Sequence, residues 1–327
     1  MSNDIVIRGL GRHVPEKILT NADFEAIVDT SDEWITTRTG IKERHVVSEG
    51  EYNSDLAVGA ARMALKNAGM EAEELTHIIM GTITADHVVP SGACVVQEKL
   101  GLKHRVAYDI SAACSGFIFG LENARAILAL HPEAKVLVIG VEVLTHRTNF
   151  EDRSTCVLFG DGAGAAILTQ GGEGPKLLDV KLSTDGSLAN LLTVSGGGSA
   201  ATYKLGDTVG PEYFIQMQGR EIFKHAVRSM TGICNQILED NNLTNKDVDV
   251  LIPHQANWRI IDAVGRKFEI PAEQVYSNVQ RFGNTSAASV PLALSEADET
   301  GFLKEGNLVM LTAFGGGFTW ASALLQY

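Results

Sequence analysis

The sequence has few cysteines, and they lie far apart. Four are present in 327 residues, and no two of them form a CxxC pair. This spacing argues against a zinc site and against a disulfide scaffold, and it favours a reducing cytoplasm as the compartment. We therefore expect no metal site, and we expect three of the four thiols to be buried as small apolar side chains. The four residues are Cys94, Cys114, Cys156 and Cys234.

Positive charge is also scarce. Lys and Arg number 27 and Asp and Glu number 40, which gives a formal net charge of −13. Because phosphate groups repel an acidic chain, neither nucleic acid nor an anionic membrane is expected as a partner. The segment MSNDIVIRGLGRHVP has no basic stretch followed by an apolar one, so no secretory signal is expected. No apolar run approaches the roughly 18 residues of a membrane helix, since Glu142 interrupts the strongest one.

Two glycine signatures of nucleotide sites are missing. GDGAG (160–164) and SGGGS (195–199) are not a GxGxxG motif that opens a helix after the first strand, and no GxxxxGK[ST] is present. A dinucleotide site and a P-loop are therefore not expected. The segment 195–211 is rich in Gly and Ser, and it predicts a surface loop between two halves of the chain.

Apolar runs alternate with helical periods along the chain, which indicates an α/β fold. The first part predicts a helix that begins at the N-cap Ser54 and stops at Gly69, and the second part repeats a similar order. Expected helices cover 53–69, 90–101, 219–242 and 258–268, and expected strands cover 75–84, 105–111, 135–144, 248–257 and 307–318.

The two parts match element by element, and duplication of one βα unit explains this better than chance similarity of ordinary α/β patterns. We expect a first half over residues 1–174 and a second half over residues 175–327. Duplicated halves bring corresponding loops together at their junction, so a site there would draw residues from both halves.

Cys114 lies in DISAACSGF (109–117), where a strand turns into a helix. Unpaired amides at the start of a helix carry partial positive charge, so this position predicts a thiol with a lowered pKa. The small residues around it permit a tight turn and close approach of a substrate. The alternative, a packed core cysteine, stays open on this segment alone.

Polar residues in the second half are candidate partners of that thiol. His254 directly follows a strand, and Asn284 falls close to the position that the repeat assigns to Cys114. FGGGF (314–318) ends the last strand and offers exposed backbone amides. A lone histidine is more often structural, but these groups lie at equivalent ends of repeated units.

Six segments together resemble β-ketoacyl-acyl-carrier-protein synthase III of the thiolase superfamily. They are DEWITTRTGI (32–41), ISAACSGF (110–117), DRSTCVLFGDGAGA (152–165), HQAN (254–257), GNTSAASVP (283–291) and AFGGGFTW (313–320). The resemblance covers nearly the whole chain. It implies a five-layered α-β-α-β-α thiolase-like fold made of two duplicated halves, usually as a homodimer. A Cys-His-Asn set separates this family from thiolases and from elongating synthases, which use Cys-His-Cys and Cys-His-His sets.

The resemblance also implies the reaction, a decarboxylative Claisen condensation that starts fatty-acid synthesis. A short acyl-CoA acylates Cys114, and malonyl-acyl-carrier protein then loses carbon dioxide and attacks the thioester, which is ping-pong chemistry. His254 and Asn284 stabilise the negative charge of the decarboxylation step, and the amides of Cys114 and Gly317 form a second oxyanion hole. No cofactor is implied beyond acyl-CoA as substrate.

Further residues match the binding positions of the family. Trp34, Arg38 and Arg153 suit the adenine and phosphates of CoA, although Trp34 could be a core residue and the arginines could pair with Asp32 or Asp152. The pantetheine positions are Thr30, Met217, Gly219, Ala256 and Asn257, the carrier-protein docking positions are Lys224, Arg259, Arg266 and Lys267, and the acyl-pocket positions are Val89 and Phe314.

The resemblance also implies a role for Val89 in the choice of primer. At this position, acetyl-preferring members of the family often have an aromatic residue that reaches across the dimer interface. The docking residues could instead be ordinary solvated charges, and Asp262 dilutes that patch. Two alternative functions remain at this stage. One is a starter-specific condensing enzyme of secondary metabolism, and the other is a non-catalytic acyl-binding subunit.

Overall fold

A mixed sheet in two matching parts organises residues 4–327, which the computed structural model describes. The strand order is β11-β12-β13-β8-β1-β7-β6-β4-β5. The first half supplies β1 (Ile5–His13), β4 (His77–Gly81), β5 (Val106–Ile110), β6 (Lys135–Val143) and β7 (Asp161–Gln170). The second half supplies β8 (Lys176–Thr184), β11 (Val250–Pro253), β12 (Leu308–Gly315) and β13 (Thr319–Gln326).

The pairing within the two parts follows one plan. β4 runs parallel to β6, β6 runs antiparallel to β7, and β7 runs antiparallel to β1. In the second half β11 runs parallel to β12, β12 antiparallel to β13, and β13 antiparallel to β8. In the first half, β5 pairs in parallel with the outer side of β4. The second half has a single parallel bridge at the equivalent place, between Leu251 of β11 and Val275. The two parts join at β1 and β8, through the pair Val6 and Lys176. This symmetry confirms the expected duplication.

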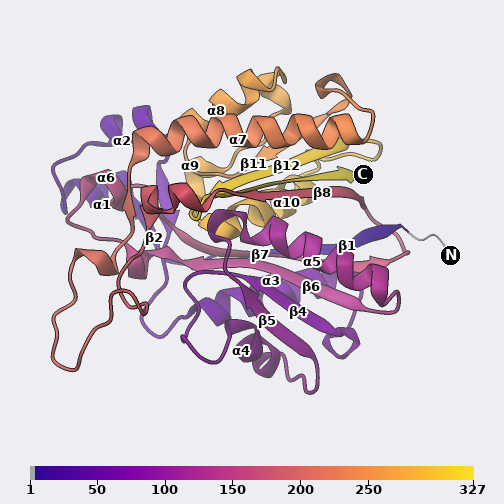
Figure 1. The fold of residues 1–327 in the computed structure, drawn as a ribbon, viewed down its shortest axis with the longest axis horizontal. Coiled ribbons are helices and arrows are strands. Elements are labelled where there is room, and N and C mark those ends of the chain that lie inside the picture. Colours follow the sequence, from indigo (N-terminus) through magenta and orange to yellow (C-terminus); the bar gives the residue numbers. More distant parts are fainter. Residues whose placement is uncertain (1–3) are drawn as a thin grey trace.

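Helices cover both outer faces and also fill the space between the two half-sheets (Figure 1). α3 (Asn53–Ala68) and α4 (Gly92–Lys99) pack on the first half-sheet, and α7 (Gly219–Asp240) and α8 (Trp258–Lys267) pack on the second. The middle layer is α5 (Gly116–Leu130) with α10 (Ser289–Glu299), whose apolar side chains share one core with strands of both halves. The layers are therefore α-β-α-β-α, as expected.

Shorter elements complete the chain. Most of them gather at the end of the molecule where α2 and α6 lie (Figure 1). They are β2 (Ile18–Thr20), α1 (Asn21–Glu25), α2 (Asp32–Thr39), β3 (Glu43–His45), α6 (Arg153–Cys156), β9 (Leu192–Thr193), β10 (Gln216–Met217) and α9 (Val279–Phe282), together with 3₁₀ turns that include η2 (Ala113–Ser115) and η8 (Ser286–Ala288).

Two local expectations need correction. α3 stops at Gly69, which is left-handed with φ 62°, as expected, but its N-cap is Tyr52 rather than Ser54. The carboxylate of Asp55 accepts the Tyr52 amide, and Ser54 lies inside the helix. The helix from Ala113 to Leu130 has the length and composition of a membrane span, contrary to expectation. Its side chains Phe117 and Leu121 are nevertheless buried in the core between the half-sheets.

The glycine-rich segments have two different roles. GDGAG lies at the start of β7, which is buried along nearly its whole length. A Cβ at Gly164 would come within 2.5 Å of the Leu292 amide nitrogen, so glycine allows α10 to lie directly on the strand. Residues 195–211 form a largely exposed loop, as expected, but it lies within the second half, after β9, rather than between the halves.

Candidate active site

Cys114 lies in a turn that joins β5 to α5, as its sequence position predicts. The preceding Ala113 is left-handed with φ 45°, a conformation that non-glycine residues adopt rarely. The start of β13 holds this turn, because the Thr319 hydroxyl donates to the Ala112 carbonyl at 2.8 Å and Ser115 Oγ donates to the Thr319 carbonyl at 3.3 Å. Gly315 is required beside it, since a Cβ there would lie 2.6 Å from the Cys114 nitrogen.

The second half contains the counterpart of this turn. Ser286 has φ 49° and begins η8, which leads directly into α10, just as Ala113 begins η2 before α5. Ala287 therefore occupies the position that corresponds to Cys114. Asn284 lies three residues before Ala287, close to the position that the repeat assigns to Cys114. The duplicated turns thus place a thiol from one half near an amide from the other.

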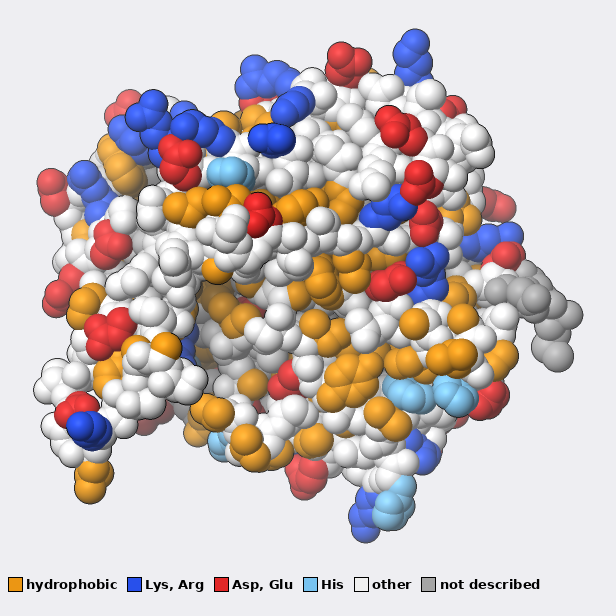
Figure 2. Space-filling view, viewed as in Figure 1, with side chains coloured by type: hydrophobic (Ala, Val, Ile, Leu, Met, Phe, Trp, Pro, Cys, Tyr) orange, Lys and Arg blue, Asp and Glu red, His pale blue; other side chains and the backbone are white. Residues whose placement is uncertain are grey.

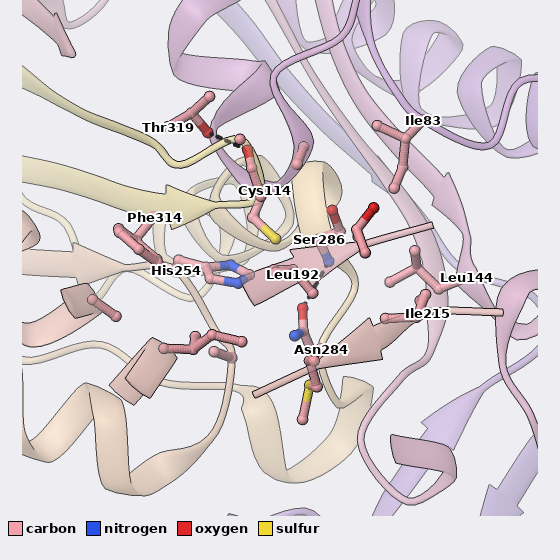
Figure 3. Close-up of a pocket in the computed structure, with 18 of the residues that line it drawn as sticks. Ile83, Cys114, Leu144, Leu192, Ile215, His254, Asn284, Ser286, Phe314 and Thr319 are labelled. Atoms are coloured by element: carbon pink, nitrogen blue, oxygen red, sulfur yellow. Dashed lines mark hydrogen bonds between the residues drawn. The ribbon is translucent and has the colours of Figure 1, made fainter. Parts of the chain in front are cut away.

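A cavity of about 590 Å³ lies where these turns meet, and Cys114, His254 and Asn284 all line it. Figure 3 shows the sulfur, the imidazole ring and the carboxamide facing the same space. The three side chains come from η2, from the residue after β11 and from the segment before η8. Residues from both halves are therefore combined in one site, as the duplication predicts.

The surroundings of His254 keep its ring neutral. The side chain is 3% exposed, and burial lowers the pKa of His254 to about 3. Its Nδ1 lies 2.5 Å from Ser289 Oγ, and its backbone amide donates to the Thr312 carbonyl at 2.7 Å. A neutral imidazole that is held at Nδ1 presents Nε2 to the cavity.

The carboxamide of Asn284 is oriented by its own chain. Its Oδ1 accepts the Ser286 amide at 2.9 Å, so its Nδ2 is left to donate. The Asn284 backbone nitrogen donates to the Leu158 carbonyl at 2.8 Å. The site therefore holds two uncharged groups that can donate hydrogen bonds near the thiol.

The expected lowering of the Cys114 pKa is wrong for the free protein. Burial raises the pKa of the Cys114 thiol to about 11; the nearby Ser286 side chain lowers it, and the charge of Glu142 raises it further. The helix start is present, but desolvation of the sulfur outweighs it. Cys114 is therefore a protonated thiol at neutral pH.

Two family models match the chain. One, described as 3-oxoacyl-[acyl-carrier-protein (ACP)] synthase III, matches residues 108–186, and its C-terminal counterpart matches residues 238–327. A β-ketoacyl-[acyl-carrier-protein] synthase III of Oleidesulfovibrio alaskensis is 56% identical, and the alignment covers 100% of both chains.

The chain belongs to the β-ketoacyl-acyl-carrier-protein synthase III family. It is an acyl-transferring condensing enzyme that initiates fatty-acid synthesis, as the sequence predicts.

Solved structures agree with this assignment. The 3-oxoacyl-[acyl-carrier-protein] synthase III of Aquifex aeolicus VF5 is 47% identical, with a TM-score of 0.90 over 99% of this chain and 100% of that one. The priming β-ketosynthase of the R1128 polyketide pathway has the same TM-score but is 31% identical, over 99% and 97% of the two chains. The Aquifex enzyme is thus more similar in sequence to this chain than this polyketide enzyme is, and the comparisons give no support to the secondary-metabolism alternative.

The residues that match CoA-binding positions of the family fall into two groups. Met217, Gly219, Ala256 and Asn257 line the cavity beside Cys114, and Asn257 also caps α8 by accepting the Ile260 amide. The others lie outside the cavity lining, near α2 and α6. They are Thr30, Trp34, Arg38 and Arg153.

Two arginines approach the ring of Trp34. The guanidinium carbons of Arg38 and Arg153 lie 4.7 and 4.8 Å from the centroid of its ring. Arg153 Nη1 also donates to the Asp29 carbonyl at 2.6 Å. The indole is half-buried rather than a core residue, and Arg153 pairs with Asp29 rather than Asp152. The hydroxyl of Thr30 is buried without a hydrogen-bond partner.

The two expected acyl-pocket residues lie in different places. Phe314 is 4% exposed, lines the cavity and makes an edge-on contact with Phe318, with ring centroids 4.7 Å apart. Val89 is 83% exposed and does not line the cavity of its own chain. Gly317, expected in the second oxyanion hole, lines the cavity with φ 121°, a conformation that favours glycine.

The expected docking residues are exposed on two neighbouring helices, Lys224 on α7 and Arg259, Arg266 and Lys267 on α8. Two of them already have acidic partners, because Lys224 pairs with Glu221 and Arg266 with Asp262. Figure 2 shows Lys and Arg side chains gathered over the end of the molecule near α2 and α8. The net negative charge of the chain is therefore not uniform over its surface.

Sequence reasoning missed three polar residues of this site: Glu142, Ser286 and Ser289. In the sequence, Glu142 is noticeable only as a charged residue within an apolar strand. This was the available signal for a polar site, because a carboxyl inside a buried strand needs hydrogen-bond donors near it.

Proposed function

We propose that Cys114, His254 and Asn284 carry out the condensation. Cys114 attacks the thioester of a short acyl-CoA and becomes acylated, and malonyl-acyl-carrier protein then enters, loses carbon dioxide and attacks the acyl group. The observation that supports this assignment is that the three side chains, from two halves of the chain, line one cavity. The alternative of a non-catalytic acyl-binding subunit does not require such a set.

His254 and Asn284 stabilise the enolate that forms as the malonyl group loses carbon dioxide. Both side chains are uncharged and largely buried, and each has one face fixed by a partner, Ser289 or the Ser286 amide. Preoriented donors in a site of low polarity contribute roughly 3–4 kcal/mol each to transition-state stabilisation. Asn284 does not titrate, so this contribution does not depend on pH.

The acyl oxygen is stabilised by a second pair of donors, the backbone amides of Cys114 and Gly317. Cys114 is the second residue of a helical segment, where amides have no partner within the helix. Gly317 is the middle residue of the turn between β12 and β13 and lines the same cavity.

CoA binds with its pantetheine arm along the cavity and its adenine at the surface. Met217, Gly219, Ala256 and Asn257 line the inner part. The adenine stacks on Trp34, and Arg153 and Arg38 hold phosphates or the base. Thr30, which lies outside the cavity lining, contacts the outer part of the arm. The chemistry needs no cofactor besides this substrate, because a thiol, an imidazole and an amide supply it.

The remaining assignments concern partners and compartment. Lys224, Arg259, Arg266 and Lys267 receive the acidic carrier protein. β5 is an edge strand, and Val106 on it and Val88 and Val89 near it are exposed, which supports a homodimer formed along this edge. We place the protein in the cytoplasm, with neither nucleic acid nor membrane as partner, and we divide its halves after residue 174, before β8.

The assignment of the nucleophile is tested by acyl labelling. Wild-type protein incubated with radiolabelled acetyl-CoA should gain one acetyl group, and peptide mass mapping should find it on Cys114. Cys114→Ala should gain none and should retain some decarboxylation of malonyl-acyl-carrier protein. Covalent label on the Cys114→Ala protein would overturn the assignment.

A further inference from the structure

A buried carboxyl lies where β4 and β6 of the first half end, and it has no part in the mechanism described above. Glu142 of β6 is 0% exposed and does not line the cavity. The Ile83 amide lies 3.1 Å from its Oε2 atom, the Thr82 hydroxyl lies 3.2 Å from the same oxygen, and Thr84 Oγ1 also donates to it. These donors, all from the segment after β4, fix one oxygen of the carboxyl.

The two threonine hydroxyls direct their protons at this carboxyl. Thr82 Oγ1 accepts the Thr84 amide at 3.1 Å and Asn53 Nδ2 at 3.2 Å. Thr84 Oγ1 accepts the Val143 amide at 2.8 Å and Asn53 Nδ2 at 3.3 Å. Since these N–H groups occupy the acceptor positions of each hydroxyl, its proton points to Glu142 Oε2. Donors therefore occupy Oε2, and a further polar contact falls to Oε1.

That further contact comes from the other half of the chain. Ser286 of η8 lies 144 residues away, and its hydroxyl donates to Glu142 Oε1 at 3.3 Å. The close approach of η8 to β6 requires Gly140, because a Cβ there would lie 2.1 Å from the Ala287 carbonyl oxygen. Glu142 thus joins two strands of the first half to the segment that follows Asn284.

Ser286 in turn holds the carboxamide of Asn284. Its amide donates to Asn284 Oδ1 at 2.9 Å, and the two residues lie next to each other in Figure 3. The backbone of Asn284 is fixed separately, because its amide donates to the Leu158 carbonyl at 2.8 Å and its carbonyl accepts the Gly160 amide at 3.1 Å. The direction of the carboxamide therefore depends on where the Ser286 amide points.

The conformation of Ser286 needs support from its surroundings. Its φ is 49°, in the left-handed region that non-glycine residues adopt rarely and at an energetic cost. The bond to Glu142 ties its side chain to the first half and so helps to keep it in this conformation. Without that bond the residue can relax toward an ordinary φ, which turns its amide away from Asn284 Oδ1.

We propose that Glu142 is a positioning residue for the condensation step, because through Ser286 it holds the Asn284 carboxamide with Nδ2 directed at the enolate oxygen. This inference rests on the proposed role of Asn284 as a donor to the enolate. Glu142 lies outside the cavity lining, so it acts through Ser286 and does not touch the substrate. Acylation of Cys114 does not use Asn284, so loss of Glu142 should slow condensation and spare acylation.

The link does not require a charge on Glu142. Burial raises the pKa of Glu142 to about 7, so both of its forms are present at neutral pH. The ionised form accepts the Ser286 hydroxyl at Oε1, and the protonated form carries its proton on Oε1 and donates it to Ser286 Oγ. Glutamine makes the second arrangement too, with its carbonyl oxygen in place of Oε2 and its Nε2 as the donor. Glu142→Gln should therefore preserve the position of Asn284, whereas Glu142→Ala should not.

The experiment measures both half-reactions in the wild type, Glu142→Ala and Glu142→Gln. Single-turnover acetylation by acetyl-CoA gives the first rate. Acetylated enzyme mixed with increasing malonyl-acyl-carrier protein then gives the maximal rate of condensation and the half-saturating concentration.

The two variants should differ in condensation and agree in acetylation. Glu142→Ala should lower the maximal rate of condensation about 10- to 30-fold, which is part of the loss that removal of the Asn284 donor causes. Its acetylation rate and half-saturating concentration should change by less than about threefold, and Glu142→Gln should stay within about threefold of the wild type throughout. Equal losses of acetylation and condensation in Glu142→Ala, or equal losses of condensation in both variants, would overturn the proposal.

A double-mutant cycle separates positioning of Asn284 from general damage to the fold. In the Asn284→Ala background no carboxamide is left to position, so Glu142→Ala should lower condensation by less than about twofold further. An equal loss in both backgrounds would show that Glu142 acts on another group, and it would overturn the proposal. Failure of the proposed function looks different, because Asn284→Ala alone would then condense at the wild-type rate.

Ser286→Ala breaks the same link and covers the case in which Glu142→Ala does not fold. It should also slow condensation and spare acetylation, and condensation at the wild-type rate would overturn the proposal. Ser322→Ala is the matched control, because Ser322 of β13 is 0% exposed and its hydroxyl donates to the Leu311 carbonyl at 2.9 Å, away from Asn284. Both of its rates should stay within about twofold of the wild type. A loss of condensation in Ser322→Ala as large as that in Ser286→Ala would overturn the proposal.

Discussion

The Nδ1 atom of His254 and the hydroxyl of Ser289 lie 2.5 Å apart, although 35 residues separate them in the chain. Ser289 Oγ also accepts the Gln255 amide at 3.3 Å. A serine hydroxyl has one proton, so when it donates to Nδ1, the neutral ring carries its proton on Nε2. That tautomer gives His254 a donor toward the cavity, which stabilisation of an enolate requires.

Loss of either donor should separate the two half-reactions. His254→Ala and Asn284→Ala are expected to retain acetylation of Cys114 and to lose condensation by about 10²- to 10³-fold each, because the donors act on the enolate. Single-turnover acetylation and steady-state product formation are to be measured on the same preparations. Loss of acetylation in both variants would refute this division of roles.

Ser289→Ala tests the tautomer itself. Without the hydroxyl the ring is free to place its proton on either nitrogen, so condensation should fall about tenfold while acetylation changes little. Ser289→Thr keeps a hydroxyl and should restore a large part of the rate. Equal condensation rates in Ser289→Ala and the wild type would show that the hydroxyl does not select the tautomer.

The buried imidazole should also make the fold sensitive to acid. The pKa of His254 is lowered to about 3 in the folded chain, so below its ordinary value of 6.5 the unfolded chain binds a proton that the folded chain does not. Stability therefore falls as pH drops, by up to about 1.4 kcal/mol per pH unit for this group. Between pH 7 and pH 5 the wild type should lose about 2 kcal/mol more than His254→Gln.

Urea unfolding at the two pH values provides this comparison. The pKa of Glu142 is raised, so its contribution has the opposite sign, but it is present in both proteins and cancels in the difference. An identical pH dependence in wild type and His254→Gln would mean that the ring takes up protons in the folded state.

The CoA assignment predicts a loss of affinity when the arginines that stack on Trp34 are removed. Arg153→Ala and Arg38→Ala should each weaken CoA binding about 5- to 50-fold, through lost stacking and phosphate contacts. Isothermal titration with CoA measures this, and Arg62→Ala, an exposed arginine on α3, is the control. Unchanged affinity in both Trp34-facing variants would refute the assignment.

Carrier-protein docking through basic side chains predicts a steep salt dependence. Screening weakens attraction between exposed charges, so the condensation rate at low malonyl-acyl-carrier protein should fall severalfold between low and moderate salt. Arg259→Glu should lower the rate further and flatten its salt dependence. Lys304→Glu makes the same kind of charge change at an exposed position outside α7 and α8 and should have little effect. A rate that is flat with salt would count against this surface.

The order of elements and the chemical residues were predictable from sequence because they depend on local signals. The periodicity of apolar residues and the glycine that ends a helix identify α3 and β12. Residues at the ends of strands identify the sites of Cys114 and His254. The surroundings of Glu142 were not predictable in this way, because its partner Ser286 lies 144 residues away and reaches it only through the packing of η8 on β6.

The pKa of Cys114 was mispredicted for a related reason. The helix start is a local feature of the sequence, and it is present. Desolvation of the sulfur depends on strands from the other half, including Gly315, which packs against the Cys114 backbone. Burial of this kind is a tertiary property, and it outweighs the local effect.

The identity of residue 89 leads to a prediction about the length of the acyl primer. The side chain is 83% exposed in one chain, beside the edge of β5, so it affects an acyl pocket only if it reaches the cavity of a second copy. Valine there in place of an aromatic ring leaves space for a longer primer, and each methylene that such a primer buries contributes about 0.8 kcal/mol. Propionyl-, butyryl- or branched acyl-CoA should therefore prime at least as well as acetyl-CoA, and Val89→Phe should shift kcat/KM toward acetyl-CoA by about tenfold.

Val88→Phe, at the neighbouring exposed position, is the matched control and should leave the preference unchanged. A wild-type preference of tenfold or more for acetyl-CoA over every longer primer would mean that residues of the cavity itself, such as Phe314, close the pocket.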